Sequence, residues 1–136
     1  MRFMGGMALT VDDTPIDLAK TYMYKGMSFS GVPNLTYSIG YTNASWTLKA
    51  DLAADFITRV LNYMQENNYH QCCPRESSGE INTKPMMTLK SGYVERAAGS
   101  FPNEGSKAPW KMYQNYILDK LTFKLASLKD GTMEFK

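Results

Sequence analysis

The chain has 136 residues, 43% of them hydrophobic, and a formal net charge of +2 at pH 7. This length is enough for one hydrophobic core, and the scattered charges leave no basic stripe of the kind that nucleic-acid binding requires. No apolar run approaches the roughly 18 residues of a membrane span, and the N-terminus lacks the apolar region of a signal peptide. We therefore expect a single small cytoplasmic domain without a membrane span.

The N-terminal part is expected to contain a hairpin. A short strand is predicted at Ala8–Val11, and the sequence Asp12–Pro15 that follows is typical of a turn. Three apolar residues offer the returning partner, although residues 20–24 could also be irregular: Ile16, Tyr22 and Tyr24.

Methionine is frequent in the same part of the chain, as Met1, Met4, Met7, Met23 and Met27. Methionine usually fills gaps in a core, and this is the favoured interpretation. The alternative is a methionine-rich surface that serves a ligand or a partner.

A strand is predicted at Leu35–Ile39, because apolar and polar residues alternate there until Gly40 ends the pattern. From Leu48 the apolar residues recur at the period of a helix that extends to about Glu66. The apolar face is predicted to contain Leu48, Leu52, Phe56, Ile57, Val60, Leu61 and Met64, and the opposite face Lys49, Asp55, Arg59, Asn62 and Glu66.

The turn between this strand and this helix has the sequence G-Y-T-N-A-S and places short polar side chains at a helix N-terminus. Such an end binds anions or electron-rich atoms, because its first amide N–H groups lack partners within the helix. Asn43 or Ser45 is the expected cap, with Thr42 as a third choice. Helix capping alone would also explain these residue types, and their spacing by itself favours that simpler interpretation.

Two asparagines, Asn67 and Asn68, are expected to end the long helix. The sequence His70-Gln71-Cys72-Cys73 that follows offers at most three of the four ligands of a zinc site, so we predict no metal centre and two free thiols. Residues 74–84 are polar and contain glycine, and an exposed loop is predicted there.

The C-terminal part is expected to contain a short helix at Ser91–Ala98 at most, then a loop and a second helix at Pro109–Leu121. Aromatic residues of that helix, Trp110 and Tyr113, could line a ligand site, although a core position is more usual. A turn at residues 129–131 should lead into a terminal strand at Thr132–Phe135, which could pair with Leu121–Leu125 if the helix ends early.

The run from Lys25 to Leu52, which contains V-P-N-L-T-Y-S-I-G-Y-T-N-A-S-W-T-L-K, resembles the C-terminal part of flavin-containing monooxygenases of the Baeyer–Villiger type. It is especially similar to the group that contains the ethionamide-activating monooxygenase. The similarity extends through Gly5–Leu18, Gly92–Ala97 and Gly105–Asp119, and so covers nearly the whole chain.

In that family the segment that resembles Asn34–Met64 is the last strand of the FAD domain and the helix after it, with the turn beside the flavin ring. The resemblance therefore implies an α/β (or α+β) fold with a small sheet, one long amphipathic helix and a second C-terminal helix, like the end of a Rossmann-type FAD domain. Residues 1–66 would form the last part of that domain, and residues 67–136 would form a C-terminal extension. The implied cofactor-binding residues are Gly40, Tyr41, Thr42, Asn43, Ala44 and Ser45.

The G-x-G-x-x-G motifs through which the family binds FAD and NADPH are absent from the chain. The only histidine, His70, does not fit the family's histidine signature, and the family's catalytic arginine would precede this segment. We therefore expect no catalytic residue here. The resemblance implies part of an FAD- and NADPH-dependent monooxygenase that inserts oxygen into ketones or oxidises sulfur compounds. The alternative is a truncated, non-enzymatic module for oligomerisation or partner binding.

The expected partners are the N-terminal portion of the enzyme or a second copy of the chain. The strand at Leu35–Ile39 would lie within a sheet in the related enzymes, and an open strand edge favours pairing with another chain. We expect such an oligomer to bury the methionine-rich N-terminal surface.

Overall fold

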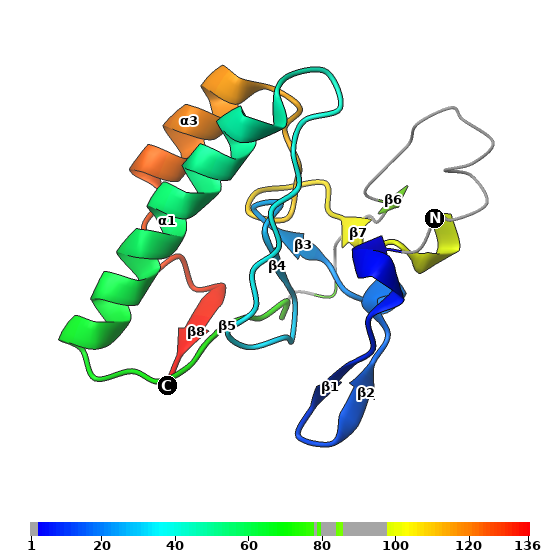
Figure 1. Ribbon diagram of the computed structural model, residues 1–136. Helices are drawn as coiled ribbons and strands as arrows, with labels where there is room; N and C mark the ends of the chain where they lie inside the picture. Colours follow the sequence, from blue (N-terminus) through cyan, green and yellow to red (C-terminus); the bar gives the residue numbers. More distant parts are fainter. Residues whose placement is uncertain (1–2, 78, 80–83, 86–97) are drawn as a thin grey trace.

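The computed structural model describes residues 3–77, 79, 84–85 and 98–136. In the described part of the chain, two α-helices stand beside short strands that pair two by two, all antiparallel (Figure 1). The pairs are β1 (Leu9–Val11) with β2 (Thr14–Ile16), β3 (Met23–Tyr24) with β4 (Ser28–Phe29), β5 (Cys72–Pro74) with β8 (Met133–Phe135), and β6 (Lys84–Pro85) with β7 (Asn103–Glu104). The α-helices are α1 (Trp46–Glu66) and α3 (Tyr116–Leu125), and 3-10 helices lie at Phe3–Gly6, Leu18–Lys20 and Ala98–Ser100.

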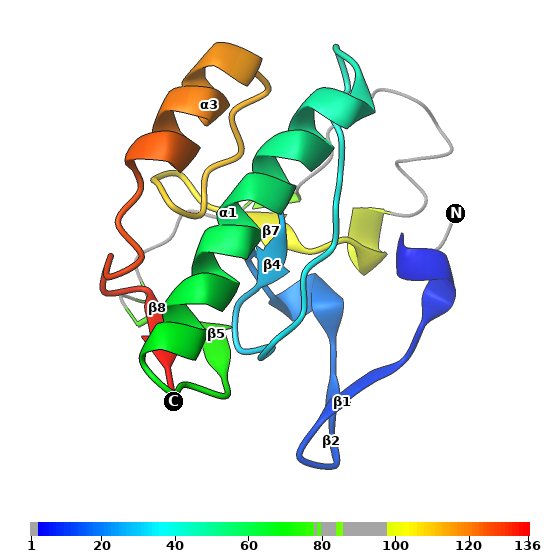
Figure 2. The same cartoon turned by 60° about the vertical axis from the view of Figure 1, so that its left-hand side comes forward.

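The two α-helices lie side by side in both views and form one layer of the molecule (Figures 1 and 2). The strands and connecting segments form the other layer, and the β1–β2 hairpin projects from it. None of the described helices is long and apolar enough to cross a membrane.

The long helix confirms the sequence prediction, with two corrections. Leu52, Phe56, Val60 and Met64 are buried, as the apolar period indicated. Leu61 was expected on the buried face but is 58% exposed, and Lys49 was expected on the polar face but is only 4% exposed. The predicted buried face extended too far toward Leu61. It should have included Lys49, which lies three, four and seven residues before buried Leu52, Ala53 and Phe56 and so on the same side of the helix.

The core between the two layers is built around Phe56. Its ring centroid lies 6.4 Å from that of Tyr24 and 5.9 Å from that of Phe123. This cluster joins residues 24–64 to the C-terminal segment through its buried members Tyr24, Met27, Leu52, Ala53, Phe56, Val60, Met64, Trp110 and Phe123.

A second cluster packs behind the strands around Phe3, whose ring centroid lies 6.0 Å from that of Phe29 and 5.4 Å from that of Phe101. The methionines are divided between core and surface. Met23 and Met27 are fully buried, which confirms the core interpretation for them, whereas Met7 is 61% exposed. Met1 lies outside the described residues.

The predicted hairpin is confirmed. β1 and β2 pair in the register Leu9 with Ile16, and the turn residues Asp12 and Asp13 have φ of 49° and 62°. Aspartate tolerates this left-handed conformation better than most residues do. Of the two tyrosines proposed as partners, Tyr24 lies in β3 and pairs with Ser28 of β4 instead.

The strand predicted at Leu35–Ile39 is wrong. Only Thr36 forms a strand-like bridge, with Ser28, although burial alternates as expected: Ile39 is buried while Thr36 and Ser38 are exposed. The segment is anchored by Tyr37 N, which donates to Met27 O at 2.7 Å. An alternating pattern reports which side chains face a core, but a strand also needs a continuous ladder of backbone partners.

The second helix begins at Tyr116 and not at Pro109. The amides of Trp110 and Lys111 both donate to Lys107 O at 2.9 Å, so a turn occupies the start of the predicted helix. Asn115 then caps α3 through its Oδ1, which accepts from the next two free amides. Ile117 and Leu121, which recur with Trp110 near helical spacing, do not share its burial: they are 68% and 54% exposed.

The end of α1 and the terminal strand agree better with expectation. Asn67 is the C-cap of α1, and Asn68 has φ of 56°. The terminal strand exists as β8, but it pairs with β5 and not with residues 121–125, which are still helical. The short helix predicted at Ser91–Ala98 lies outside the described residues except for Ala98. Of the loop predicted at 74–84, residues 78 and 80–83 lie outside the described residues, and its two ends, Pro74 and Lys84, belong to β5 and β6.

Candidate functional site

The turn before α1 divides into a buried and an exposed half. Gly40 and Tyr41 are buried, and Tyr41 is only 3% exposed. Thr42, Asn43 and the next two residues, Ala44 and Ser45, are exposed. Of the six residues predicted to line a cofactor site, four therefore face solvent and two connect the turn to the interior.

The N-terminus of α1 carries no side-chain cap. Ser45 occupies the N-cap position, yet its Oγ forms a 2.7 Å hydrogen bond with Thr47 Oγ1 and none with a backbone amide of the first turn. The first amides of a helix lack intrahelical acceptors, and a helix of 21 residues places a partial positive charge at this end. The arrangement can accept an electron-rich atom from outside the helix.

Directly behind the turn, two side chains donate to one carboxylate oxygen of a third residue. Tyr41 OH and Lys49 Nζ each donate to Asp119 Oδ2 at 2.7 Å. The Lys49 ammonium also lies 4.6 Å from the centroid of the Phe123 ring. All three polar residues are buried, so an elementary charge of each sign lies in the interior and is paired there.

Burial shifts the pKa of two residues of this cluster, Lys49 and Tyr41. It lowers the pKa of Lys49 from its ordinary value, and the hydrogen bond to Asp119 opposes that effect. Burial also raises the pKa of the Tyr41 hydroxyl, and the hydrogen bond to Asp119 raises it further. Tyr41 therefore remains a hydrogen-bond donor throughout the neutral range.

A second contact lies beside the first. Gln114 Oε1 accepts from the backbone amide of Thr42 at 3.1 Å and from its hydroxyl at 3.2 Å. Asn43 Nδ2 donates to the backbone oxygen of Gln114 at 3.2 Å. Two consecutive residues of the turn, Thr42 and Asn43, are thus bonded to Gln114 in the segment that leads into α3.

The turn is also in contact with the first residue of α1. A Cβ atom placed on Gly40 would lie 2.1 Å from Cγ of Trp46, so the indole ring occupies the space that any larger residue at position 40 would need. Trp46 as a whole is nevertheless 61% exposed.

Sequence reasoning did not identify Lys49, Gln114 or Asp119 as part of this site. A signal for Lys49 was its position on the apolar face of α1, where an unpaired charge would be costly. Gln114 and Asp119 lie in the family-like run Gly105–Asp119, but nothing in that run indicates which distant residues it contacts.

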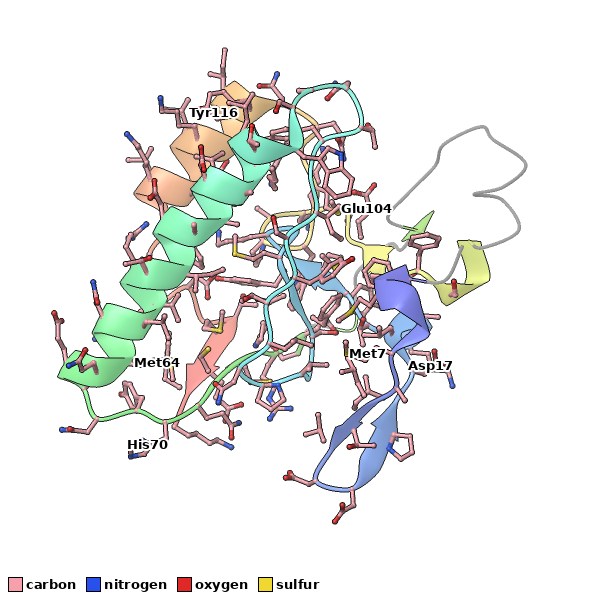
Figure 3. All side chains as sticks on the ribbon, in the orientation of Figure 1. Met7, Asp17, Met64, His70, Glu104 and Tyr116 are labelled. Atoms are coloured by element: carbon pink, nitrogen blue, oxygen red, sulfur yellow. The ribbon has the colours of Figure 1, made fainter. Side chains whose placement is uncertain are left out.

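His70 and the two cysteines lie far from the turn. His70 is exposed beyond the C-terminal end of α1, whereas the turn precedes the N-terminal end (Figure 3). In the described part of the chain, no three His, Cys, Asp or Glu side chains are grouped as a metal site would require. Cys72 and Cys73 are free thiols whose pKa burial raises.

The aromatic ligand wall suggested at Trp110 and Tyr113 takes a different form. Trp110 is 6% exposed and packs edge-on against Tyr24, with 5.8 Å between centroids, so it belongs to the core. A mainly apolar groove of about 400 Å³ lies elsewhere, between α1 and residues 34–36, where Ile57, Leu61 and Met64 line it.

Comparison with known proteins identifies relatives over the whole chain. The protein named "FAD-containing monooxygenase EthA" of Mycolicibacterium smegmatis is 42% identical over 135 residues, which are 99% of this chain and 27% of that protein. EthA of Mycobacterium tuberculosis is 38% identical over 135 residues, 99% of this chain and 28% of that protein. The protein named "Probable FAD-binding monooxygenase AlmA" of Acinetobacter baylyi is 43% identical over 136 residues, 99% of this chain and 27% of its own length.

The chain thus spans about a quarter of the length of the curated relatives it matches. No protein-family model matches it, and no solved structure does. Identity of this level over nearly every residue of the chain shows common descent with a region of these relatives.

Proposed function

We propose that this chain, a homologue of part of the FAD-containing monooxygenases, forms one wall of the flavin site in an FAD- and NADPH-dependent monooxygenase that inserts oxygen into ketones or oxidises sulfur compounds. The observation that carries the proposal is the exposed turn at residues 42–45, which leads into the uncapped N-terminus of α1. The relatives contain FAD, and the turn offers donors where an electron-rich group could dock.

The residues of the turn fit a flavin edge in two respects. The free amides at the start of α1 can donate to a carbonyl oxygen or ring nitrogen, and the partial positive charge there favours such an atom. Thr42 and Asn43 are held by hydrogen bonds to Gln114 and are still exposed to solvent. Bound FAD supplies the redox chemistry, while these residues bind and orient it.

The chain is not expected to be catalytic alone, because its sequence lacks the nucleotide-binding motifs. We propose that the N-terminal portion of the enzyme packs beside α1, on the side of the groove of about 400 Å³. Leu61 is 58% exposed there, and the neighbouring residues 35–39 are extended with a single strand-like bridge. An apolar helix flank beside an extended segment with open backbone groups suits an added strand or helix.

Titration of the purified chain with FAD tests the proposal. We expect binding weaker than about 1 µM, because the pyrophosphate anchor of FAD would lie in the N-terminal portion. Asn43→Ala and Ser45→Ala should weaken binding more than His70→Ala, since His70 lies at the other end of a helix roughly 30 Å long. Equal effects of the three substitutions would contradict the flavin position.

The second candidate is a non-enzymatic module for oligomerisation or partner binding, and the outer face of α3 favours it. Four large apolar side chains are exposed on this helix: Ile117 (68%), Leu118 (48%), Leu121 (54%) and Leu125 (81%). A colourless, stable oligomer that ignores added FAD would support this candidate. A flavin spectrum in the purified protein would support the first.

A further inference from the structure

We propose that Asp119 and Gln114 are positioning residues that set the conformation of the flavin-side turn, an inference that rests on the proposed function. Neither residue lies in the turn, and neither would touch the cofactor. They act through Tyr41, Thr42 and Asn43, from which they are separated by 71 to 78 residues of sequence.

The contacts form two independent anchors. The inner anchor is buried, where Tyr41 OH donates to Asp119 Oδ2 at 2.7 Å. The outer anchor is exposed, where Thr42 N donates to Gln114 Oε1 at 3.1 Å. Tyr41 is held through its side chain and the adjacent Thr42 through its backbone amide. Hydrogen bonds at two neighbouring residues leave the backbone between them little freedom to rotate.

The inner anchor is itself fixed by both helices. Asp119 lies in the first turn of α3, which Asn115 caps, and its oxygen also accepts from Lys49 of α1 at 2.7 Å. The turn therefore takes its position from the packing of α3 on α1. Ser45, the local candidate for this task, bonds to Thr47 and does not cap the helix.

Trp46 reports on the turn because its indole lies against Gly40. The chain contains one other tryptophan, Trp110, which is buried in the core near Tyr24. Labelling with 5-fluorotryptophan thus gives two fluorine NMR signals, one for the turn and one for the core. The experiment uses the full 136-residue chain.

Asp119→Asn is the obvious variant, but it leaves the Lys49 ammonium buried without its counter-charge and can unfold the chain. Tyr41→Phe and Gln114→Ala remove one anchor each and keep the ion pair. We expect both variants to shift or broaden the Trp46 signal and to leave the Trp110 signal in place. Gln114→Glu, which keeps an acceptor oxygen at the same reach, should restore the Trp46 signal.

Tyr24→Phe is the matched control, because Tyr24 OH also donates to an aspartate, Asp130, at 2.7 Å. It lies next to Trp110, so it should move the Trp110 signal and not the Trp46 signal. The positioning role is wrong if Tyr41→Phe and Gln114→Ala leave the Trp46 signal unchanged. It is also wrong if these two variants move the Trp110 signal together with the Trp46 signal, because the change would then not be confined to the turn.

FAD addition separates this inference from the proposed function. Tyr41→Phe and Gln114→Ala should each lower FAD affinity about fivefold, the factor that corresponds to one hydrogen bond of about 1 kcal/mol. If the Trp46 signal moves as expected while FAD affinity stays constant in every variant, the turn is held as described but does not serve flavin. That outcome overturns the flavin role of Asp119 and Gln114. The proposed function fails separately, if Asn43→Ala and Ser45→Ala weaken FAD binding no more than His70→Ala does.

Discussion

Asn34 and Cys72 are joined as if they belonged to neighbouring strands, although Asn34 lies in no strand. Asn34 N donates to Cys72 O at 2.9 Å, and Cys72 N donates to Asn34 Oδ1 at 2.9 Å. Asn34 Nδ2 also donates to His70 O at 3.1 Å. A side chain thus replaces the backbone acceptor that a true ladder would have used, and this contact fixes the start of the extended segment 35–39 against β5.

Asn34 further has φ of 55°, which alanine adopts only at a cost. We predict that Asn34→Ala lowers the free energy of unfolding by about 2 kcal/mol, because it loses both the side-chain bonds and the favoured backbone conformation. Asn34→Gly keeps the conformation and should cost about 1 kcal/mol. Urea unfolding measures both, and a larger loss for glycine than for alanine would exclude the backbone contribution.

The buried pair of Lys49 and Asp119 makes a second prediction about stability. Their side chains are 5% and 3% exposed, so removing one partner leaves an unpaired charge in the interior. Lys49→Ala should cost about 3–5 kcal/mol. The combined change Tyr41→Phe, Lys49→Met and Asp119→Leu should cost much less, because no polar group is then left without a partner.

The control for this experiment is Lys20→Ala, which breaks the exposed pair with Asp17, where the two charged atoms lie 3.8 Å apart. It should change stability little, since water screens exposed pairs. If Lys49→Ala were equally mild, the pair would not be buried as described.

Substitutions along α1 test which face packs on the core. Phe56 is 2% exposed between Tyr24 and Phe123, and Phe56→Ala should cost about 3–5 kcal/mol. Arg59→Ala should cost about 1 kcal/mol, because its guanidinium donates to the backbone oxygens of Phe123 and Ala126 at 2.7 and 2.9 Å. Exposed Leu61 serves as the control, and Leu61→Ala should be close to neutral in thermal unfolding.

Thiol modification tests the burial of the two cysteines. Burial raises the pKa of Cys72 and Cys73 above the ordinary thiol value, so the folded chain holds less thiolate than a free cysteine at any pH near neutrality. We expect slow alkylation by iodoacetamide at pH 7.5 and a rapid increase in urea. Because the folded state favours the neutral thiol, these groups stabilise it fully below the ordinary thiol pKa. That contribution is lost as the pH rises through the folded values.

Fast alkylation of the native chain at neutral pH would contradict this assignment. Cys73, which is 0% exposed, should react last, and mass spectrometry of partly modified protein distinguishes the two sites.

Self-association should involve α3 and not the methionine-rich segment. Leu121 and Leu125 are 54% and 81% exposed on the outer face of the helix, whereas two of the methionines expected at an interface, Met23 and Met27, are buried. If the purified chain is a dimer by light scattering, Leu121→Glu with Leu125→Lys should convert it to monomer. Met7→Lys is the matched surface control and should leave the mass unchanged. A dimer that responds only to Met7→Lys would restore the original prediction.

The sequence by itself determined the elements whose causes are local. The apolar period of residues 48–66 predicted α1, because burying one face of a long helix outweighs any competing preference. The aspartates at 12 and 13 predicted the hairpin, and Asn67 with Asn68 predicted the end of the helix. The turn 40–45 was predicted as a helix start from its residue types, and Ser45 is indeed the N-cap position.

Tertiary structure decided everything that depends on a distant partner. Residues 35–39 have the period of a strand but lack the ladder, since no local pattern encodes which backbone lies alongside. Pro109 was predicted as the helix start, but α3 begins at Tyr116 because Asn115 caps it there, and Trp110 is buried in the core. Lys49, which was predicted on the polar face of α1, is buried, and Asp119, 70 residues away, supplies its counter-charge in the interior.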